Sequence, residues 1–374
     1  MIEITEVKTR KQLKEFAEFV NKLYKGCPYY VPTLFGDELD MFTPSENPSF
    51  EECEVVMFLA KRDGETVGRI AGIIQNTYNR LHDCKLVRFT RFDSIDDQEV
   101  ANALFDAVSG WAKERGINGI VGPLGFNDLD REGLLIDGFD RICTYETQYN
   151  YDYYPKLIEN YGFKKDADWV EYRLTCPPSI DERYERIGNR ILEKYDLRVV
   201  KGLKTKQFIE KYGDDVFDLI DEGYGQLYGV VPFSKKTRQL ILSQFGVALN
   251  TELMVLVVDK DDKPVAYALT LPSLSNALVG SGGHLYPHTI VKLLKAIKKP
   301  KEIDFALVSI KTEYQNKGLN AIIFNELMTR FINRGIGYCE TNLNLEDNLA
   351  VQNMWHNYER EQHKRRRSYF KSIE

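Results

Sequence analysis

The feature that most constrains this chain is an internal repeat. Residues 102–117 read NALFDAVSGWAKERGI and residues 321–336 read AIIFNELMTRFINRGI. Both segments place a Phe eleven residues before a Gly, and both end in Arg-Gly-Ile. Each has apolar residues at helical spacing, and its Gly stands where a helix commonly ends in a left-handed residue. The repeat predicts that the chain folds as two copies of one unit.

The segments around the repeated helix also agree in order. Each half reads as a β-hairpin, a strand, the repeated helix, a second strand, a further helix and a closing strand. The hairpins are predicted over 55–74 and 253–271, and the strands that precede the helix over 85–92 and 302–310. Strands alternating with helices predict an α/β fold with a mixed sheet in each half.

A chain of 374 residues is long enough for two domains of ordinary size. The best boundary is Cys176-Pro177-Pro178, because Pro-Pro stops strands and helices alike. We therefore expect a first domain over 1–178, a linker helix over 179–195 and a second domain over 196–374.

Composition excludes several classes of protein. The net charge of −6 argues against a dedicated nucleic-acid binder, and we expect no DNA partner. No stretch of eighteen apolar residues predicts a membrane span, and the polar start does not resemble a signal peptide. The six scattered cysteines favour reduced thiols in the cytoplasm over disulfides or zinc, and the histidine spacing predicts no metal site.

The second half carries the most informative motif. The polar turn 315–320, QNKGLN, lies between a predicted strand and the repeated helix. The first N–H groups of a helix have no partner within it and carry partial positive charge, so they attract anions. Gly318 allows close approach of the backbone, and Gln315 and Lys317 add side-chain donors. The turn predicts a phosphate site.

This turn resembles the coenzyme A pyrophosphate loop of the GCN5-related N-acetyltransferase (GNAT) family. The family pattern is Arg or Gln, two residues, Gly, one residue, then Gly or Ala, and this chain departs from it at Asn320. The element order is that of the family. The resemblance implies two tandem GNAT-like domains, acetyl-CoA or another acyl-CoA as co-substrate, and coenzyme contacts from Val308, Ser309, Ile310, Gln315, Asn316, Lys317, Gly318, Leu319, Asn320 and Asn348.

The resemblance also implies catalytic roles. A carboxylate on the strand after the helix often serves as general base, and the nearest candidates are Glu340 and Glu346. In the family, a Tyr seven residues after the Asn that corresponds to Asn348 often serves as general acid. Position 355 is Trp in this chain. Tyr358, one helical turn further on, is the predicted substitute.

The two halves differ at the loop. Aligned through the repeat, Gln315 to Gly318 falls opposite Asp96, Asp97, Gln98 and Glu99. Like charges about 4 Å apart repel by roughly 4 kcal/mol at an effective dielectric of about 20, so carboxylates disfavour a pyrophosphate there. We expect coenzyme A to bind the second half only, and the first half to be a degenerate copy that shapes the acceptor site.

The sequence thus predicts an N-acyltransferase that moves an acetyl or other acyl group from acyl-CoA to the amine of a small molecule or peptide. Two alternatives stay open. One is a Fem-like transferase that uses aminoacyl-tRNA, which would require a basic groove. The other is a non-catalytic module that binds coenzyme A or another ligand. The acceptor and the oligomeric state are not specified by the sequence.

Overall fold

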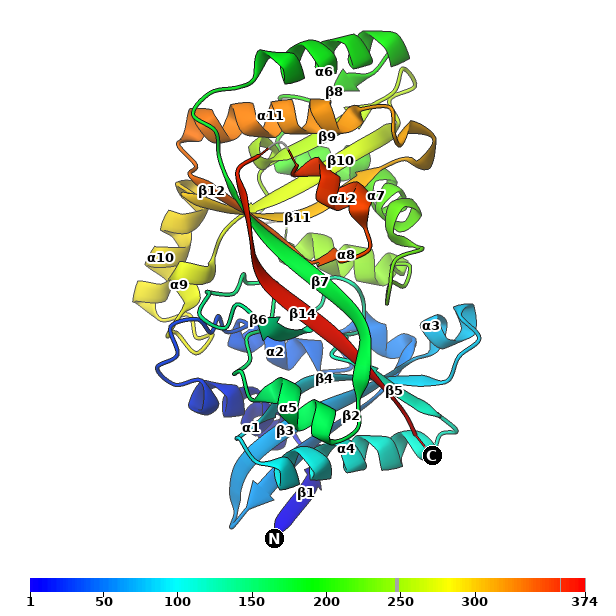
Figure 1. Ribbon diagram of the computed structural model, residues 1–374, viewed down its shortest axis with the longest axis vertical. Helices are drawn as coiled ribbons and strands as arrows, with labels where there is room; N and C mark the ends of the chain where they lie inside the picture. Colours follow the sequence, from blue (N-terminus) through cyan, green and yellow to red (C-terminus); the bar gives the residue numbers. More distant parts are fainter. Residues whose placement is uncertain (246–248, 357, 374) are drawn as a thin grey trace. The chain divides into compact units, whose positions relative to one another are not determined.

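The computed structural model describes residues 1–245, 249–356 and 358–373, which form two compact units (Figure 1). Unit 1 comprises Met1–Val170, Ser275–Leu293 and His363–Glu374. Unit 2 comprises Glu171–Leu274 and Leu294–Gln362. The chain is a mixed α/β protein, as the sequence predicts.

The two units are not contiguous in sequence. Residues 275–293 and 363–374, which the sequence division places in the second domain, pack with unit 1. The C-terminal strand explains part of this exchange, because Tyr369 to Ser372 pair antiparallel with residues 119–122. Pairing between strands so far apart in sequence leaves no local pattern to read. The limits of an isolated domain stay a prediction.

Unit 1 is built on a mixed sheet whose strands run in the order β1-β2-β3-β4-β5-β14. All neighbours are antiparallel except β4 and β5. Its strands are β1 (Ile2–Glu6), β2 (Cys53–Arg62), β3 (Glu65–Gln75), β4 (Leu86–Ser94), β5 (Gly119–Gly122), β6 (Leu134–Asp137) and parts of β7 (Lys164–Thr175) and β14 (Arg360–Ser372). Its helices are α1 (Arg10–Leu23), α2 (Phe35–Met41), η1 (Pro48–Glu51), α3 (Asn76–Leu81), α4 (Gln98–Lys113), α5 (Tyr154–Asn160) and α9 (Ser275–Leu278).

Two apolar clusters cover the two faces of this sheet. On one face, Leu104 and Phe105 of α4 and Leu157 of α5 pack on β2, β3 and β4. On the other face, Phe16 of α1 and Leu39 of α2 pack on β2 and β3. Helices on both sides explain why β4 is buried on both of its faces from Val87 to Ser94, its polar side chains included.

Unit 2 repeats this plan with the strand order β7-β12-β11-β10-β9-β8. Its strands are the C-terminal part of β7, β8 (Arg198–Val199), β9 (Met254–Val258), β10 (Pro264–Pro272), β11 (Glu302–Ile310), β12 (Tyr338–Thr341) and β13 (Asn344–Leu345). Its helices are α6 (Glu182–Tyr195), α7 (Thr205–Tyr224), α8 (Lys235–Phe245), η2 (Thr251–Leu253), η3 (Thr312–Tyr314), α11 (Leu319–Arg334) and α12 (Leu349–Met354). Helix α10 (Pro287–Lys298) contains the junction between the two units.

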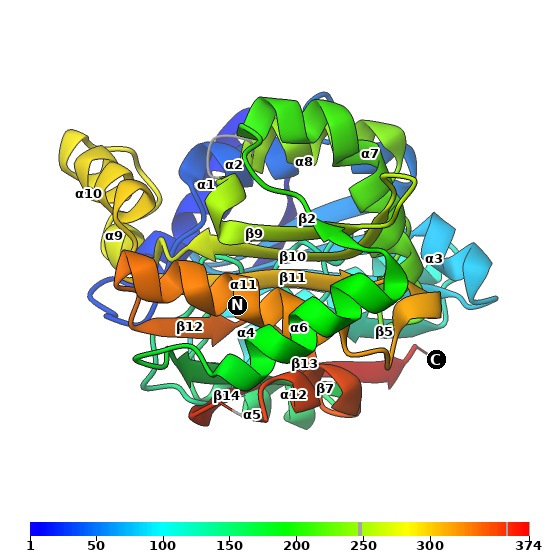
Figure 2. The same ribbon diagram turned by 90° about the horizontal axis from the view of Figure 1, so that it is seen from above.

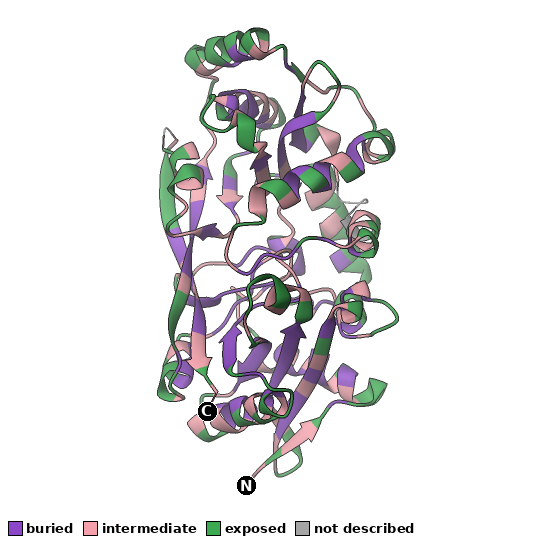
Figure 3. Cartoon of the chain, turned by 90° about the vertical axis from the view of Figure 1, so that its right-hand side faces the viewer, coloured by how far each residue is buried: buried purple, intermediate pink, exposed green. Residues whose placement is uncertain are grey.

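Seen from above, α7 and α8 lie on one side of strands β9, β10 and β11, and α11 and α6 lie on the other (Figure 2). Buried residues concentrate on the strands, and exposed residues on the outer faces of the helices (Figure 3). Helices α6 and α11 pack closely, since Gly188 lies against the backbone of Ile322. The helix predicted over the linker is therefore α6, and it belongs to unit 2.

Local backbone features confirm the repeated elements. Asp63 and Gly64 both adopt positive φ, 53° and 82°, in the tight hairpin that the sequence predicts between β2 and β3. Asp262 has φ 64° in the corresponding turn of unit 2. Gly116 (φ 73°) and Gly335 (φ 65°) follow the two repeated helices in the left-handed conformation.

Candidate functional site

In unit 2, β11 and β12 begin side by side and then separate. Their parallel register runs from Glu302↔Tyr338 to Phe305↔Thr341, and the Asn342 N–H donates to the Phe305 carbonyl at 3.1 Å. Strand β11 continues to Ile310 with β10 on its other side. Within the part of the chain that the structure describes, residues 306–310 have no strand partner on the β12 side. This leaves a stretch of free strand edge.

A tyrosine hydroxyl binds the middle of this edge. The Val308 N–H donates to the Tyr224 hydroxyl at 3.2 Å, and that hydroxyl donates to the Val308 carbonyl at 3.1 Å. Val308 is opposite Ala268 of β10, so backbone groups that bond Tyr224 point away from β10. Tyr224, the last residue of α7, therefore occupies the backbone position that the resemblance assigns to the pantetheine arm.

The other two strand residues of the predicted site have different surroundings. The Ser309 side chain is buried and donates to the Leu219 carbonyl at 2.7 Å. The Ile310 carbonyl accepts from Gln315 Nε2 at 3.2 Å. The backbone groups of Val308 and Ile310 therefore both point away from β10, and those of Ser309 point toward it.

The predicted loop leads from this edge into α11. Gly318 is the N-cap residue with φ +85°, a left-handed conformation that favours glycine. Among the described residues, no side chain caps this helix N-terminus. Gln315, Asn316, Lys317 and Asn320 are exposed around it. The terminus of a sixteen-residue helix is therefore open to an anion.

Two features favour glycine at position 318. Its φ is +85°, and a Cβ there would lie 2.8 Å from Cδ1 of Ile191 on α6. The phosphate contact predicted for Gly318 stays a prediction. Leu319 is buried in the core and offers only its backbone. The Lys317 ammonium lies 5.2 Å from the Tyr195 ring centre and 5.0 Å from that of Tyr314, and it is the exposed charge at this terminus.

The predicted base lies just before the point of separation. Glu340 of β12 is half-buried, with Asp304 of β11 beside it and Arg173 of β7 opposite it. The Asn348 side chain accepts from the Val351 N–H at 3.3 Å and caps α12. Asn348 therefore serves the helix in this structure, and its coenzyme contact stays a prediction.

The predicted acid does not lie on a helix. Helix α12 ends at Met354, so the helical spacing used to choose Tyr358 does not hold. The Tyr358 ring packs 5.4 Å from Phe324 and 6.2 Å from Tyr184, and burial raises its pKa well above the usual range. A phenol held neutral in this way can donate a proton, but its geometry must be argued from the fold rather than from the motif.

Trp355, the residue at the family's Tyr position, is 1% exposed. Its ring lies 5.0 Å from Phe305 and 5.4 Å from Phe324, beside the point where β11 and β12 separate. Its indole Nε1–H is buried and has no hydrogen-bond partner among the described residues. Buried donors are nearly always satisfied, so an unpaired one marks a place for water or a ligand. The resemblance singled out position 355, but only the fold shows that its side chain carries an unpaired donor.

The corresponding terminus in unit 1 is closed. The Asp97 side chain caps α4 by accepting from the N–H groups of Glu99 (2.9 Å) and Val100 (3.4 Å). Arg62 pairs with the same carboxylate at 2.7 Å. The Asp97 side-chain hydrogen bond from Arg62 lowers the pKa of this carboxyl. An internal anion already fills this terminus, which supports the expectation that unit 1 binds no coenzyme.

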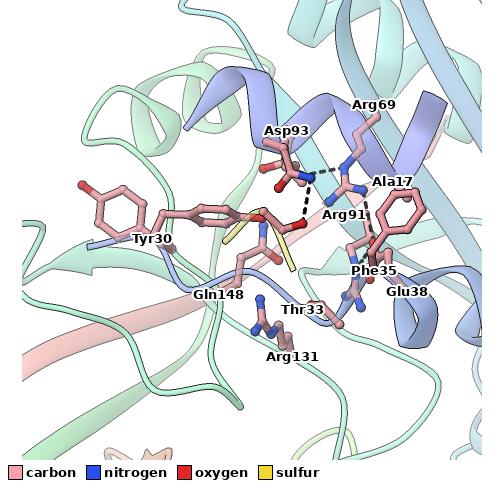
Figure 4. A pocket seen from close by; sticks show the side chains of 14 residues that line it. Ala17, Tyr30, Thr33, Phe35, Glu38, Arg69, Arg91, Asp93, Arg131 and Gln148 are labelled. Carbon is pink, nitrogen blue, oxygen red and sulfur yellow. Dashed lines mark hydrogen bonds and ion pairs between the residues drawn. The ribbon is translucent and has the colours of Figure 1, made fainter. Parts of the chain in front are cut away.

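Unit 1 also contains a buried charged pocket that the sequence did not reveal (Figure 4). Arg69 donates to Glu38 at 3.1 Å and to Asp93 at 2.9 Å, and Arg91 donates to both oxygens of Glu38 at 3.0 and 3.1 Å. Arg131 points into the same pocket and donates to main-chain carbonyls. The cavity measures about 20 Å³, which is room for about one water molecule.

This pocket is a tightly paired polar core. Burial alone would raise the pKa of Glu38, but the Arg91 and Arg69 guanidinium groups outweigh it and lower that pKa to about 2. Tyr24 donates to Asp93 at 3.0 Å, and Tyr154 accepts from the Ser94 N–H at 3.1 Å. The pocket is far smaller than an acyl-CoA, so it provides no second coenzyme site in unit 1.

A larger cavity of about 210 Å³ lies in unit 2 toward the other end of α11. Glu326 and Arg330 of that helix and Lys201 line it. Glu326 is eight residues beyond Gly318, about 12 Å along the helix axis. This cavity is therefore separate from the helix N-terminus. The described residues contain no group of three His, Cys, Asp or Glu side chains that could hold a metal ion.

Comparison with known proteins supports the architecture. No protein-family model matches the chain. It is 26% identical over 375 residues to protein YghO of Escherichia coli, covering 97% of this chain and 94% of that protein. It is 27% identical over 388 residues to a bacterial ceramide synthase of Caulobacter vibrioides, covering 100% of this chain and 98% of that protein.

Solved structures give the fold. A tandem GNAT protein from the clavulanic acid biosynthesis pathway superposes with a TM-score of 0.58 and 10% identity, covering 100% of this chain and 99% of that one. A GCN5-related glucosamine N-acetyltransferase region of a fungal multi-domain enzyme gives 0.57 and 11%, covering 99% of this chain and 38% of that one. The chain has the tandem GNAT fold that the repeat and the loop motif predict.

Proposed function

We propose that this protein transfers an acyl group from acyl-CoA to an amine, with the coenzyme held by unit 2. One observation carries the proposal: the free edge of β11 leads directly to the uncapped N-terminus of α11, whereas the equivalent helix terminus in unit 1 is filled by Asp97. The tandem GNAT fold of the relatives supports the same reaction class. Fold alone does not fix a reaction, so the site is the argument.

The residues of unit 2 fit the parts of coenzyme A. An extended pantetheine arm carries amides that can pair with the Val308 backbone, as an added strand does, once they displace the Tyr224 hydroxyl from it. The α11 N-terminus and Lys317 suit the pyrophosphate, because both are positive and exposed. The unpaired Trp355 Nε1–H lies beside Phe305, where the thioester end would follow the strand.

Besides binding the coenzyme, the chain needs a proton acceptor for the amine and a proton donor for the thiolate. The amine nitrogen attacks the thioester carbonyl, the new C–N bond forms, the C–S bond breaks, and one proton leaves the amine. Glu340, half-buried where β11 and β12 separate, is the proposed acceptor of that proton, directly or through water. Tyr358, kept neutral by burial, is the proposed donor to the thiolate.

For the acceptor, we propose a long-chain amino alcohol and, for the donor, a fatty acyl-CoA. This choice is taken from the bacterial ceramide synthase, which aligns over the whole chain at 27% identity. Ceramide is the amide of a fatty acid with a long-chain amino alcohol, and its formation is the reaction class proposed from the site.

The test is an acyl-transfer assay with acetyl-CoA and a long-chain acyl-CoA, each offered to a long-chain amino alcohol and to a short polar amine. Release of free thiol and mass of the amide product are measured together. Lys317→Glu should weaken coenzyme binding at least tenfold, because it reverses the exposed charge at the α11 terminus. Lys206→Glu, at a lysine whose side chain is 86% exposed on α7, is the matched control.

The outcomes separate the alternatives. Amide formation that Lys317→Glu suppresses and Lys206→Glu does not would support the proposal. Coenzyme binding without turnover on either amine would favour a binding module. Binding that is equal in Lys317→Glu and in the unchanged chain would remove the α11 terminus from the site.

A further inference from the structure

The segment 285–298 combines exposed apolar side chains with lysines. Five of the large apolar residues that are most exposed in the described chain fall within ten positions. They are Leu285 (53%), Tyr286 (50%), Ile290 (41%), Val291 (65%) and Leu294 (49%). Single exposed apolar residues are ordinary, but a group of this kind marks an interaction surface.

Three of these residues form a stripe along α10, labelled in Figure 2. Ile290 and Leu294 are four residues apart, and Val291 and Leu294 are three apart, so their side chains are neighbours on one continuous helix. Thr289 is buried, and Leu293, Ala296 and Ile297 are half-buried on the opposite side of the apolar arc. Part of the apolar face therefore packs on protein, while the stripe stays 41–65% exposed.

The charge beside the stripe has one sign. Residues 285–301 contain Lys292, Lys295, Lys298, Lys299 and Lys301 and no Asp or Glu, although the whole chain has a net charge of −6. Lys295 comes four residues after Val291, and Lys298 comes four residues after Leu294, so each lysine lies one helical turn beyond a stripe residue. Long lysine side chains can keep their ammonium groups at a polar boundary while their stems follow apolar surface.

The chain before the helix is fixed to unit 1. Asn21 Nδ2 donates to the Gly282 carbonyl at 3.0 Å, and the Phe35 N–H donates to the Gly283 carbonyl at 2.9 Å. The His284 ring lies 4.7 Å from that of Phe35. The exposed apolar residues are thus presented from an anchored segment, so their exposure is a property of the fold.

We propose that the α10 surface, defined as Leu285, Tyr286, Ile290, Val291, Leu294 and the five lysines, docks the protein on an anionic lipid bilayer. No helix in the described residues is long and apolar enough to cross a membrane. The twelve residues of α10 extend about 18 Å, against roughly 30 Å of hydrocarbon, so the helix lies in the interface rather than spanning it. Apolar residues on one face and lysines beside them are the chemistry of interfacial helices.

The charge of the α10 surface favours an anionic bilayer over a second copy of the chain as its partner. The lysine-bearing surface is attracted to anionic headgroups, each lysine strengthening binding by about fivefold near an anionic surface. Two copies apposed through the same surface would bring ten lysines together and repel. The proposal does not depend on acyl transfer, since bilayer binding is measured without turnover.

The experiment is flotation of the full chain with vesicles of phosphatidylglycerol and, separately, of phosphatidylcholine. We expect binding to phosphatidylglycerol that weakens with salt, and much weaker binding to phosphatidylcholine. Ile290→Ser with Leu294→Ser should abolish binding. Lys295→Glu with Lys298→Glu should weaken it by more than about 25-fold, since neutralising each lysine accounts for about fivefold.

The matched control replaces two other exposed apolar residues, Leu81→Ser with Ile187→Ser, at side chains that are 58% and 47% exposed. This variant should bind vesicles like the unchanged chain, and unchanged circular dichroism of all variants shows that they fold. The proposal is overturned if the chain does not float with phosphatidylglycerol, or if the α10 variants bind as well as the control. It is also overturned if sedimentation shows an oligomer that Ile290→Ser with Leu294→Ser dissociates while no vesicle binding occurs.

Discussion

Replacing Tyr224 by Phe should tighten coenzyme A binding, although it removes two hydrogen bonds from the protein. The Tyr224 hydroxyl binds the Val308 N–H at 3.2 Å and the Val308 carbonyl at 3.1 Å. In our proposal a pantetheine amide pairs with these same backbone groups. The coenzyme must therefore displace the hydroxyl before it can bind, and Phe keeps the ring without the competing group.

The size of the effect follows from the two bonds. A neutral hydrogen bond contributes about 0.5–1.5 kcal/mol net, so displacing two costs about 1–3 kcal/mol. Since 1.4 kcal/mol corresponds to a factor of ten, the dissociation constant should fall by at least about fivefold and at most about 150-fold. Isothermal titration calorimetry with coenzyme A measures this directly.

A matched control exists in unit 1. The Tyr153 hydroxyl donates to the Ser94 carbonyl at 2.7 Å on the equivalent strand β4, and Tyr153→Phe should leave coenzyme affinity unchanged. Unchanged or weaker affinity in Tyr224→Phe would show that the edge at Val308 does not hold pantetheine. An affinity change in Tyr153→Phe would move the site to unit 1.

Three further changes test other parts of the structure. Glu38→Gln should lower the free energy of unfolding by roughly 3 kcal/mol near neutral pH, because the Glu38 pKa of about 2 lies below its ordinary 4.5. Urea unfolding followed by circular dichroism should show that this difference persists above pH 4.5 and vanishes as the pH falls toward 2. Asp168→Asn should cost about 2 kcal/mol in the same assay, because its fully buried carboxylate binds Arg365 and Arg367 at 2.8 Å while both cations stay partly exposed. Trp355→Phe should change the unfolding midpoint little but weaken acyl-CoA binding by about fivefold, because it removes a donor that has no partner in the described chain; equal affinity would exclude Nε1 from the site.

Much of the fold could be predicted from local sequence patterns. The Asp63-Gly64 turn demands positive φ at both positions, and the structure has it there. Strand β11 matches its predicted range of 302–310, because its apolar run has clear polar ends. Helix α11 ends at its C-cap Gly335, and Gly116 follows the end of α4 at Lys113; both glycines adopt the left-handed conformation that suits this residue.

Local patterns could not predict that residues 275–293 and 363–374 pack with unit 1. Whether residues 363–374 join the sheet of one half or the other depends on pairing with residues 119–122 and on the Asp168 ion pairs. Neither is visible in the sequence of the strand itself. The contiguous division at residue 178 therefore describes the order of the elements rather than the composition of each unit.

The candidate site could likewise be predicted only where its residues carry a local sequence signature. Turn chemistry located Gly318 and the α11 terminus, because a glycine turn before a helix has a local signature. Tyr224 could not be found, since its hydroxyl reaches Val308 from 84 positions away. The charged pocket around Glu38 and Arg69 likewise joins residues from α2 and β3 that are 31 positions apart.

The most direct test of the central claim is a crystal structure of the full chain with coenzyme A. The account predicts one coenzyme per chain in unit 2, with its pantetheine arm along residues 306–310 of β11, its pyrophosphate at the N-terminus of α11, and the Tyr224 hydroxyl displaced from Val308. A coenzyme bound along β4 with its pyrophosphate at the terminus of α4, where Asp97 now caps the helix, would contradict it.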